Sequence, residues 1–269
     1  MQALIIRALL AAIAAGAITG LARARGVLAA SGQWAGFFLG VLSAAAGWAW
    51  AGLLVAFFLS STALTAWRVE EKLRRTERIL PRITARGALQ VLANGGAFVL
   101  LALLFQRSGH PRWALGALGA LAAASADTWS TEVGMLFGGT PRSIWSARAL
   151  PLGMSGGVTV VGFLAALAGA LFIAAPGAVL LFSAPLNAGV AVLAGGFAGC
   201  VGDSLVGGAL QSKRYCDRCG EWTERRVHPC GYRTKHRAGL HWVTNDLVNV
   251  SATAIGALVA IAIGRAWTP

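Results

Sequence analysis

The sequence is poor in charged residues, and above all in acidic ones. Only 12% of its 269 residues are charged, and 10 Asp and Glu stand against 23 Lys and Arg. A soluble globular domain carries about 25% charged residues, so this composition excludes that class. Hydrophobic residues make up 57% of the chain and recur in runs of membrane-spanning length, which indicates a multi-spanning membrane protein.

The formal net charge of +13 does not indicate a nucleic-acid binder. Lys and Arg are confined to short segments between apolar runs, as is typical of cytoplasmic loops in membrane proteins. We therefore expect the lipid bilayer, and no nucleic acid, as a partner.

The apolar runs predict eight transmembrane helices at about 20 residues per span. The charge-free stretch 34–67 is too long for a single pass, so we expect a tight turn within 47–52. The fold class is thus an all-α polytopic membrane helix bundle, a single membrane domain over 1–269. The predicted helices lie near 3–20, 34–48, 50–66, 84–106, 113–138, 156–175, 185–209 and 244–264.

The distribution of basic residues supports this count. With the N-terminus outside, the loops 21–33, 67–86, 139–155 and 210–243 face the cytoplasm and hold 19 of the 23 Lys and Arg residues. Eight helices thus satisfy the positive-inside rule in the cell (inner) membrane, and both termini lie outside. The first 17 residues also resemble a secretory signal, but we expect them to be retained, because their removal would upset this orientation.

Four of the predicted helices carry polar residues at a similar depth in the cytoplasmic half of the membrane. Asp127 lies roughly 22 Å along its helix from the outer end, at 1.5 Å per residue. The whole set comprises four acids and three amides: Asp127, Glu132, Asp203, Asp246, Asn94, Asn245 and Asn249.

Several acids at one depth indicate a functional site, because an ionised carboxylate in hydrocarbon is costly. A bound cation removes their mutual repulsion, and oxygen ligands suit Mg²⁺, so we expect Asp127, Asp203 and Asp246 to hold it. Asp127 and Glu132 lie about 140° apart around a regular helix, which favours Asp127 over Glu132 as the ligand. The alternative is that these side chains form interhelical hydrogen bonds.

Residues 153–157, GMSGG, are expected to open the sixth helix. The backbone N–H groups of Ser155, Gly156 and Gly157 could then bind an anion at the positive end of that helix, although glycine-rich helix starts are also common packing devices. Together with Mg²⁺ and a nearby cation, this turn outlines a phosphoryl-transfer site. The expected cations are Arg68, Lys72 and Arg142. Segment 68–83 is predicted to be a helix on the inner membrane face that Pro81 stops or kinks, and binding of anionic lipid headgroups is favoured there over direct substrate contact.

The loop 210–243 contains a metal-binding pattern, KRYCDRCGEWTERRVHPCG over residues 213–231. Its Cys216, Cys219, His228 and Cys230 match the ligand set of a closed, structural Zn²⁺ site. A disulfide is disfavoured on the cytoplasmic side and would leave one of the three cysteines unpaired. We expect a zinc knuckle in this loop, between helices seven and eight. The fourth cysteine, Cys200, lies within a helix and is expected to be a small packing residue.

The segments around these residues resemble a known family. SSTALTAW, ALQVLANGG, ASADTWSTEVG, TPRSIW, GMSGGVTVVG, GDSLVGGALQ and TNDLVN follow one another as in the integral-membrane family that contains transmembrane protein 19 and the plant phytyl-phosphate kinase of tocopherol synthesis. The resemblance covers nearly the whole chain. The sequence differs from the family pattern at Ala66, where many members have Lys. It also differs at Met154 and Ser155, where they often have Thr-Asn.

The resemblance implies a kinase. A nucleoside triphosphate, with CTP favoured, would transfer a phosphoryl group to a phytyl or prenyl monophosphate and give the diphosphate. Such an acceptor has a second pKa near 6, so it needs alignment and charge neutralisation more than a general base. Nucleotide and phosphate binding would fall to the GMSGG turn and its cations.

Two other functions are compatible with parts of the sequence. Intramembrane acids also occur in cation- or proton-coupled transporters, but here they cluster toward one side and we find no clear inverted repeat. A lipid-binding scaffold would leave the acids on several helices without an explanation. The kinase is therefore the favoured prediction.

Overall fold

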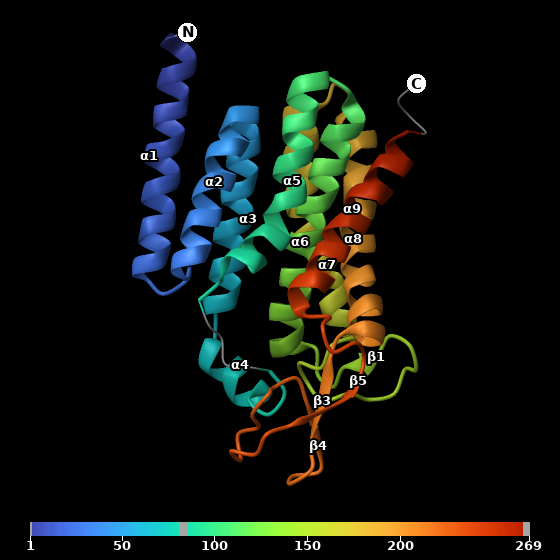
Figure 1. Ribbon diagram of the computed structural model, residues 1–269. Coiled ribbons are helices and arrows are strands. Elements are labelled where there is room, and N and C mark those ends of the chain that lie inside the picture. The colour runs from blue at the N-terminus through green and yellow to red at the C-terminus, as the bar shows by residue number, and fades with distance from the viewer. Residues whose placement is uncertain (1, 81–84, 266–269) are drawn as a thin grey trace.

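The fold is that of a computed structural model in which residues 2–80 and 85–265 are described (Figure 1). Helices dominate this part of the chain, and most of them run along one bundle axis. The helices are α1 (Gln2–Ala24), α2 (Ala30–Ala46), α3 (Trp48–Ala66), α4 (Val69–Thr76), α5 (Ala88–Ser108), α6 (Pro111–Phe137), α7 (Val160–Leu181), α8 (Pro185–Leu210) and α9 (Asn245–Gly264).

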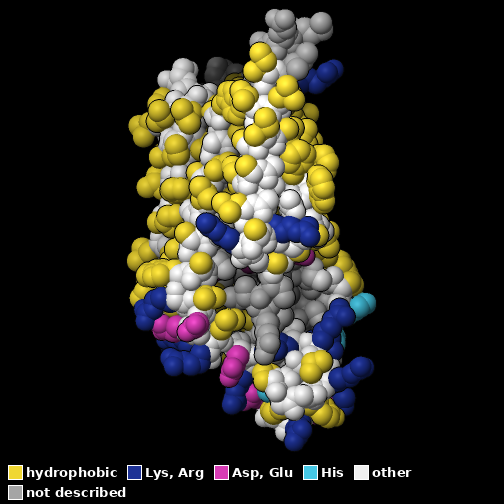
Figure 2. All heavy atoms as spheres, turned by 90° about the vertical axis from the view of Figure 1, so that its left-hand side faces the viewer, with side chains coloured by type: hydrophobic (Ala, Val, Ile, Leu, Met, Phe, Trp, Pro, Cys, Tyr) yellow, Lys and Arg dark blue, Asp and Glu magenta, His cyan; other side chains and the backbone are white. Residues whose placement is uncertain are grey.

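The two ends of the bundle differ in character. Figure 1 shows the start of α1 and the end of α9 at one end, and α4 with the strands at the other. The segments predicted to be cytoplasmic thus gather at a single end, which we call the loop end. Hydrophobic side chains cover most of the upper part of the face in Figure 2, and charged side chains gather toward the loop end. This arrangement is typical of a bundle that stands in a bilayer.

Five of the described helices, α3, α5, α7, α8 and α9, are long and apolar enough to cross a membrane. Many of their large side chains point outward, with Leu89, Val160 and Leu186 more than 70% exposed. Outward apolar side chains are favourable where lipid replaces water. The chain is therefore a multi-pass membrane helix bundle, while the count of eight spans remains a prediction.

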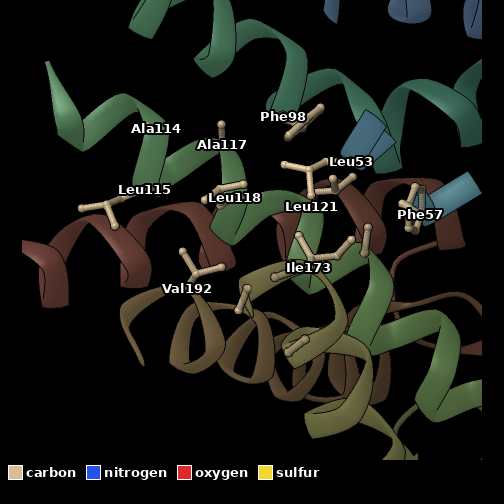
Figure 3. Packing of buried hydrophobic residues seen from close by; sticks show 14 of the residues in the cluster. Leu53, Phe57, Phe98, Ala114, Leu115, Ala117, Leu118, Leu121, Ile173 and Val192 are labelled. Carbon is tan, nitrogen blue, oxygen red and sulfur yellow. The ribbon is translucent and has the colours of Figure 1, made fainter. Parts of the chain in front are cut away.

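The centre of the bundle is α6, which packs against α5, α7, α8 and α9. Every residue from Ala114 to Ala126 is buried. Small residues permit this close packing, since a Cβ added at Gly199 would stand 2.4 Å from the Cβ of Ala123. Larger side chains, Leu118, Leu121 and Ile173 among them, fill the remaining space in the core shown in Figure 3.

The predicted turn between the second and third helices is confirmed. Gly47 ends α2 and precedes α3, with φ 153° and ψ 153°. A side chain rarely adopts so large a positive φ, so glycine is favoured here. The break occurs at one residue of the predicted 47–52 segment.

The prediction of an all-α fold needs one correction, because two small antiparallel sheets lie at the loop end. In the first, β1 (Arg142–Ser143) pairs with β2 (Gly157–Val158). The second has the order β4-β3-β5, from β4 (Glu221–Thr223), β3 (Lys213–Cys216) and β5 (Lys235–Ala238). Strands of two to four residues are too short for their alternation to be recognised in a sequence.

Two of the helix boundaries that differ from the prediction lie next to the predicted site residues. α4 ends at Thr76, well before Pro81, which lies outside the described residues. α7 begins at Val160, after Thr159, whose side chain accepts a hydrogen bond from the Gly162 N–H. Residues 153–157 therefore form a turn ahead of the helix and not its first turn.

Candidate functional site

A cavity of about 820 Å³ opens among the helices toward the loop end. Part of its wall is apolar and comes from the middle of α1, α2 and α3, with Ile18, Leu39 and Phe57 among the lining residues. The rest is polar and comes from α5, α6, α8, α9 and the loops. One cavity thus joins an apolar compartment inside the bundle to a polar compartment at its loop end.

Most of the predicted site residues line this one cavity, although they come from segments far apart in the sequence. Of the predicted acids, amides and phosphate-binding residues, Arg68 and Arg142 are absent from its wall, as are the four zinc ligands. The residues present are Asn94, Asp127, Glu132, Asp203, Asn245, Asp246, Asn249, Ser155, Gly156, Gly157 and Lys72.

Asp127 and Asp203 both line the cavity, and Oδ1 of Asp203 is buried without a hydrogen-bond partner among the described residues. The buried run of α6 ends at Ala126, so Asp127 is where this helix enters the cavity. The two carboxylates are close enough for their charges to interact. A buried, unpaired acid is costly unless a cation joins it, and this donor set of oxygens fits Mg²⁺.

Glu132 differs from these acids because both of its oxygens are engaged. Thr65 Oγ1 donates to Oε1 at 2.7 Å, and Lys72 Nζ donates to Oε2. Lys72 is 1% exposed, and its other two bonds go to the carbonyls of Leu64 at 2.7 Å and Thr65 at 2.9 Å. All three donors of the ammonium are used, so the structure does not support the predicted phosphate-binding role for Lys72.

The other two predicted cations point elsewhere. Arg68 pairs with Glu71 at 2.6 Å, and Arg142 donates to the Ala147 carbonyl at 2.9 Å. These contacts are local ones within α4 and the 139–155 loop.

Arg86, which sequence reasoning missed, lines the cavity instead. It donates to Thr62 Oγ1 at 3.4 Å, a long bond, and to Thr65 Oγ1 at 3.1 Å. Burial lowers the pKa of Arg86, and the charge of Glu132 opposes that effect. Nothing in the sequence sets Arg86 apart from the other basic residues of its loop.

The GMSGG turn packs against α8 beside Asp203. Gly156 has φ +82°, and a Cβ there would stand 2.4 Å from the Cα of Gly208. Gly157 N–H bonds to the Met154 carbonyl at 3.1 Å. The packing explanation for these glycines is therefore supported, while Ser155 has a different partner.

Glu224, from the loop between β4 and β5, is that partner. Its Oε1 accepts the Ser155 N–H at 2.9 Å and also the Ser155 hydroxyl, and its Oε2 accepts from Gln211 Nε2 at 2.9 Å. Burial raises the pKa of Glu224, and the bonds from Ser155 oppose that rise. Arg214, Arg226 and His241, which belong to the wider 210–243 segment, also line the cavity. The 210–243 loop thus forms part of the cavity wall.

The four predicted zinc ligands lie together in this loop. Their ligand atoms are all within 4.8 Å of one another, and none of the cysteines is in a disulfide. The Sγ atoms of Cys216 and Cys230 are 3.7 Å apart, near the roughly 3.8 Å edge of a tetrahedron with Zn–S bonds of about 2.3 Å. His228 Nδ1 lies 3.2 Å from Cys230 Sγ, and its Nε2 lies 3.3 Å from Glu221 Oε2. The residues therefore fit a structural zinc site with a supporting carboxylate.

Cys200 lies apart from this cluster. It is 2% exposed on α8 and belongs to the apolar core. Its predicted packing role is confirmed.

Fold and cavity together define a helical integral membrane protein with an acid-lined cavity at one end of its bundle. Residues 13–257 match the family of integral membrane proteins named DUF92, and the chain belongs to that family. The family predicted from the motifs is thus confirmed.

Curated relatives extend this finding. The chain is 30% identical to Protein PGR of Arabidopsis thaliana over 257 residues, which is 86% of this chain and 88% of the relative. It is 30% identical to the chloroplastic Protein VTE6 of the same plant over 242 residues, 87% of this chain and 64% of the relative. An uncharacterized membrane protein of Methanocaldococcus jannaschii is 35% identical over 162 residues, 60% of this chain and 65% of that protein. No solved structure matches the chain.

Proposed function

We propose that this protein is an isoprenoid-monophosphate kinase of the membrane. It transfers the terminal phosphoryl group of a nucleoside triphosphate, with CTP favoured, to a phytyl or prenyl monophosphate. The main support for the proposal is that one continuous cavity has an apolar wall among α1, α2 and α3 and an acid-lined polar end. A lipid phosphate needs both compartments, one for its tail and one for its headgroup. The family resemblance and the similarity to VTE6 support the same reaction.

The reaction needs no proton transfer near neutral pH. An oxygen of the lipid phosphate attacks the terminal phosphorus of the triphosphate, and the bond from that phosphorus to the bridging oxygen breaks, which releases the nucleoside diphosphate. The lipid phosphate has already lost most of its second proton, since that pKa is about 6. The site must therefore align two anions and neutralise their charge.

We assign these two tasks, alignment and charge neutralisation, to different residues of the cavity. Asp127, Asp203 and Asp246 would hold Mg²⁺, which when bound neutralises phosphate charge. The unpaired Oδ1 of Asp203 supports this assignment. Asn94, Asn245 and Asn249, which line the same cavity, orient the substrates by hydrogen bonds. Arg86 replaces Lys72 as the expected phosphate-binding cation, because Lys72 has no free donor.

The test is to incubate the purified protein with Mg²⁺, phytyl or geranylgeranyl monophosphate, and each labelled triphosphate in turn. We expect labelled lipid diphosphate with one of these pairings, and almost none from the Asp203→Asn variant. The matched control is Asp217→Asn, which removes a carboxylate that pairs with Lys235 outside the cavity. The kinase is rejected if no pairing gives diphosphate, or if Asp203→Asn leaves the rate unchanged. Cation-dependent uptake into proteoliposomes would then indicate a transporter.

A further inference from the structure

Glu224 accepts hydrogen bonds from Ser155, whose donors are expected from the sequence to bind phosphate. The Ser155 N–H and hydroxyl both point at Glu224 Oε1 in place of a ligand. The loop 210–243 contains three acids, and of these Glu224 is the one that lines the cavity. A carboxylate thus stands where an anionic substrate would bind.

Hydrogen bonds attach the loop that carries Glu224 to the segment after α4. Thr223 Oγ1 donates to the Arg78 carbonyl at 2.7 Å, and the Glu224 N–H donates to the Ile79 carbonyl at 2.9 Å. Contacts of this kind break and re-form at modest cost where water replaces them, so the loop can leave the cavity without disturbing the helical core.

The charged groups near Glu224 act on its seated position in both directions. Asp203 lines the same cavity, and when both carboxylates are charged their repulsion opposes that position. Lys213 and the donors of Ser155 and Gln211 favour it. The seated position of Glu224 therefore depends on opposing interactions. A second anion in the cavity would add repulsion and favour release of the carboxylate.

We propose that Glu224 is a built-in competitor for the phosphate site, and that phosphate binding displaces it and moves the 210–243 loop away from the cavity. This inference rests on the proposed function, since it takes the donors of Ser155 as the phosphate site. One N–H group cannot serve two anions at once, so Glu224 and phosphate exclude each other. The competition lowers the apparent affinity for phosphate by the fraction of molecules in which Glu224 is seated.

The test measures binding and not catalysis, so that it is independent of kinase activity. Labelled pyrophosphate with Mg²⁺ is the probe, and equilibrium dialysis of the full chain in detergent micelles gives its Kd. Removal of the competitor in Glu224→Ala should lower that Kd about tenfold. Glu224→Gln keeps an acceptor for Ser155 and loses the charge, so it should give a smaller decrease. Glu77→Gln, which removes an acid outside the cavity on the neighbouring segment, should change nothing.

A second measurement needs no variant. In the wild-type protein, pyrophosphate should speed hydrogen exchange at the Glu224 amide, because displacement breaks its bond to Ile79. An unchanged or higher Kd in both Glu224 variants would overturn the proposal, as would slower exchange in the loop. If pyrophosphate binding behaves as expected but no lipid diphosphate forms in the kinase assay, the competition stands and the proposed reaction fails.

Discussion

The buried ammonium of Lys72 is bonded to Glu132 and so ties α4 to the loop-end half of α6. The same ammonium binds two carbonyls at the end of α3. One side chain therefore joins three helices at the wall of the cavity.

Lys72→Met is expected to destabilise the protein by about 3–5 kcal/mol, because it leaves Glu132 as an uncompensated buried charge. The unfolding midpoint in detergent micelles measures this loss. The double variant Lys72→Met, Glu132→Gln should recover much of it, since Glu132 then has no charge left without its ammonium partner. Equal midpoints for the single variant and the wild type would show that the pair does not stabilise the fold.

Gly156→Ala is expected to cost about 2 kcal/mol or more, because the added Cβ would collide with the α8 backbone and the residue has a positive φ. Thermal unfolding is again the measurement. Gly96→Ala is the matched control, since nothing lies within 4 Å of the added Cβ and alanine favours the helix. The two variants should shift the midpoint in opposite directions. A similar small effect in both would argue against tight packing of the turn on α8.

Arg86→Gln is expected to raise the KM for the lipid monophosphate at least about tenfold, as the loss of a charged hydrogen-bond donor implies. Arg142→Gln should stay near the wild-type value, because Arg142 does not line the cavity. Steady-state kinetics at saturating triphosphate give both numbers. If Arg142→Gln shows the larger effect, the assignment of the phosphate-binding cation is wrong.

The purified protein is expected to contain about one zinc ion per chain, bound by the four ligands of the 210–243 loop. Cys216→Ser should lose most of it, because one ligand is gone, and Cys200→Ser should retain it. Elemental analysis of the two variants decides the question. Undiminished zinc in Cys216→Ser would exclude this site.

The loop end is expected to face the cytoplasm. An alkaline phosphatase domain fused after Gly264 should then be active in intact cells, and the same domain inserted at Ser146 should be inactive. The opposite pattern would reverse the orientation.

The long helices could be predicted from the sequence because each is a continuous apolar run. The helix predicted at 185–209 is α8, which spans Pro185–Leu210. The helix predicted at 244–264 is α9, which spans Asn245–Gly264. The polar residues at matching depth also proved to share one cavity, since depth follows directly from the rise per residue of each helix.

Contacts between distant segments could not be predicted in this way. Ser155 and Glu224 are 69 residues apart, and Lys72 and Glu132 are 60 apart. Whether a basic or acidic side chain of a loop turns into the cavity or toward water depends on how that loop folds back. The sequence alone therefore led to Lys72, and only the fold revealed Arg86 and Glu224.

The position of α1 links the N-terminal segment to the shape of the cavity as well as to the membrane orientation. This helix packs along α2 and contributes Ala15, Ile18 and Thr19 to the cavity wall. A chain that lost α1 to a signal peptidase would have an apolar compartment open sideways to the acyl chains of the bilayer. Under the proposed kinase function, we therefore expect α1 to limit which lipids reach the acids.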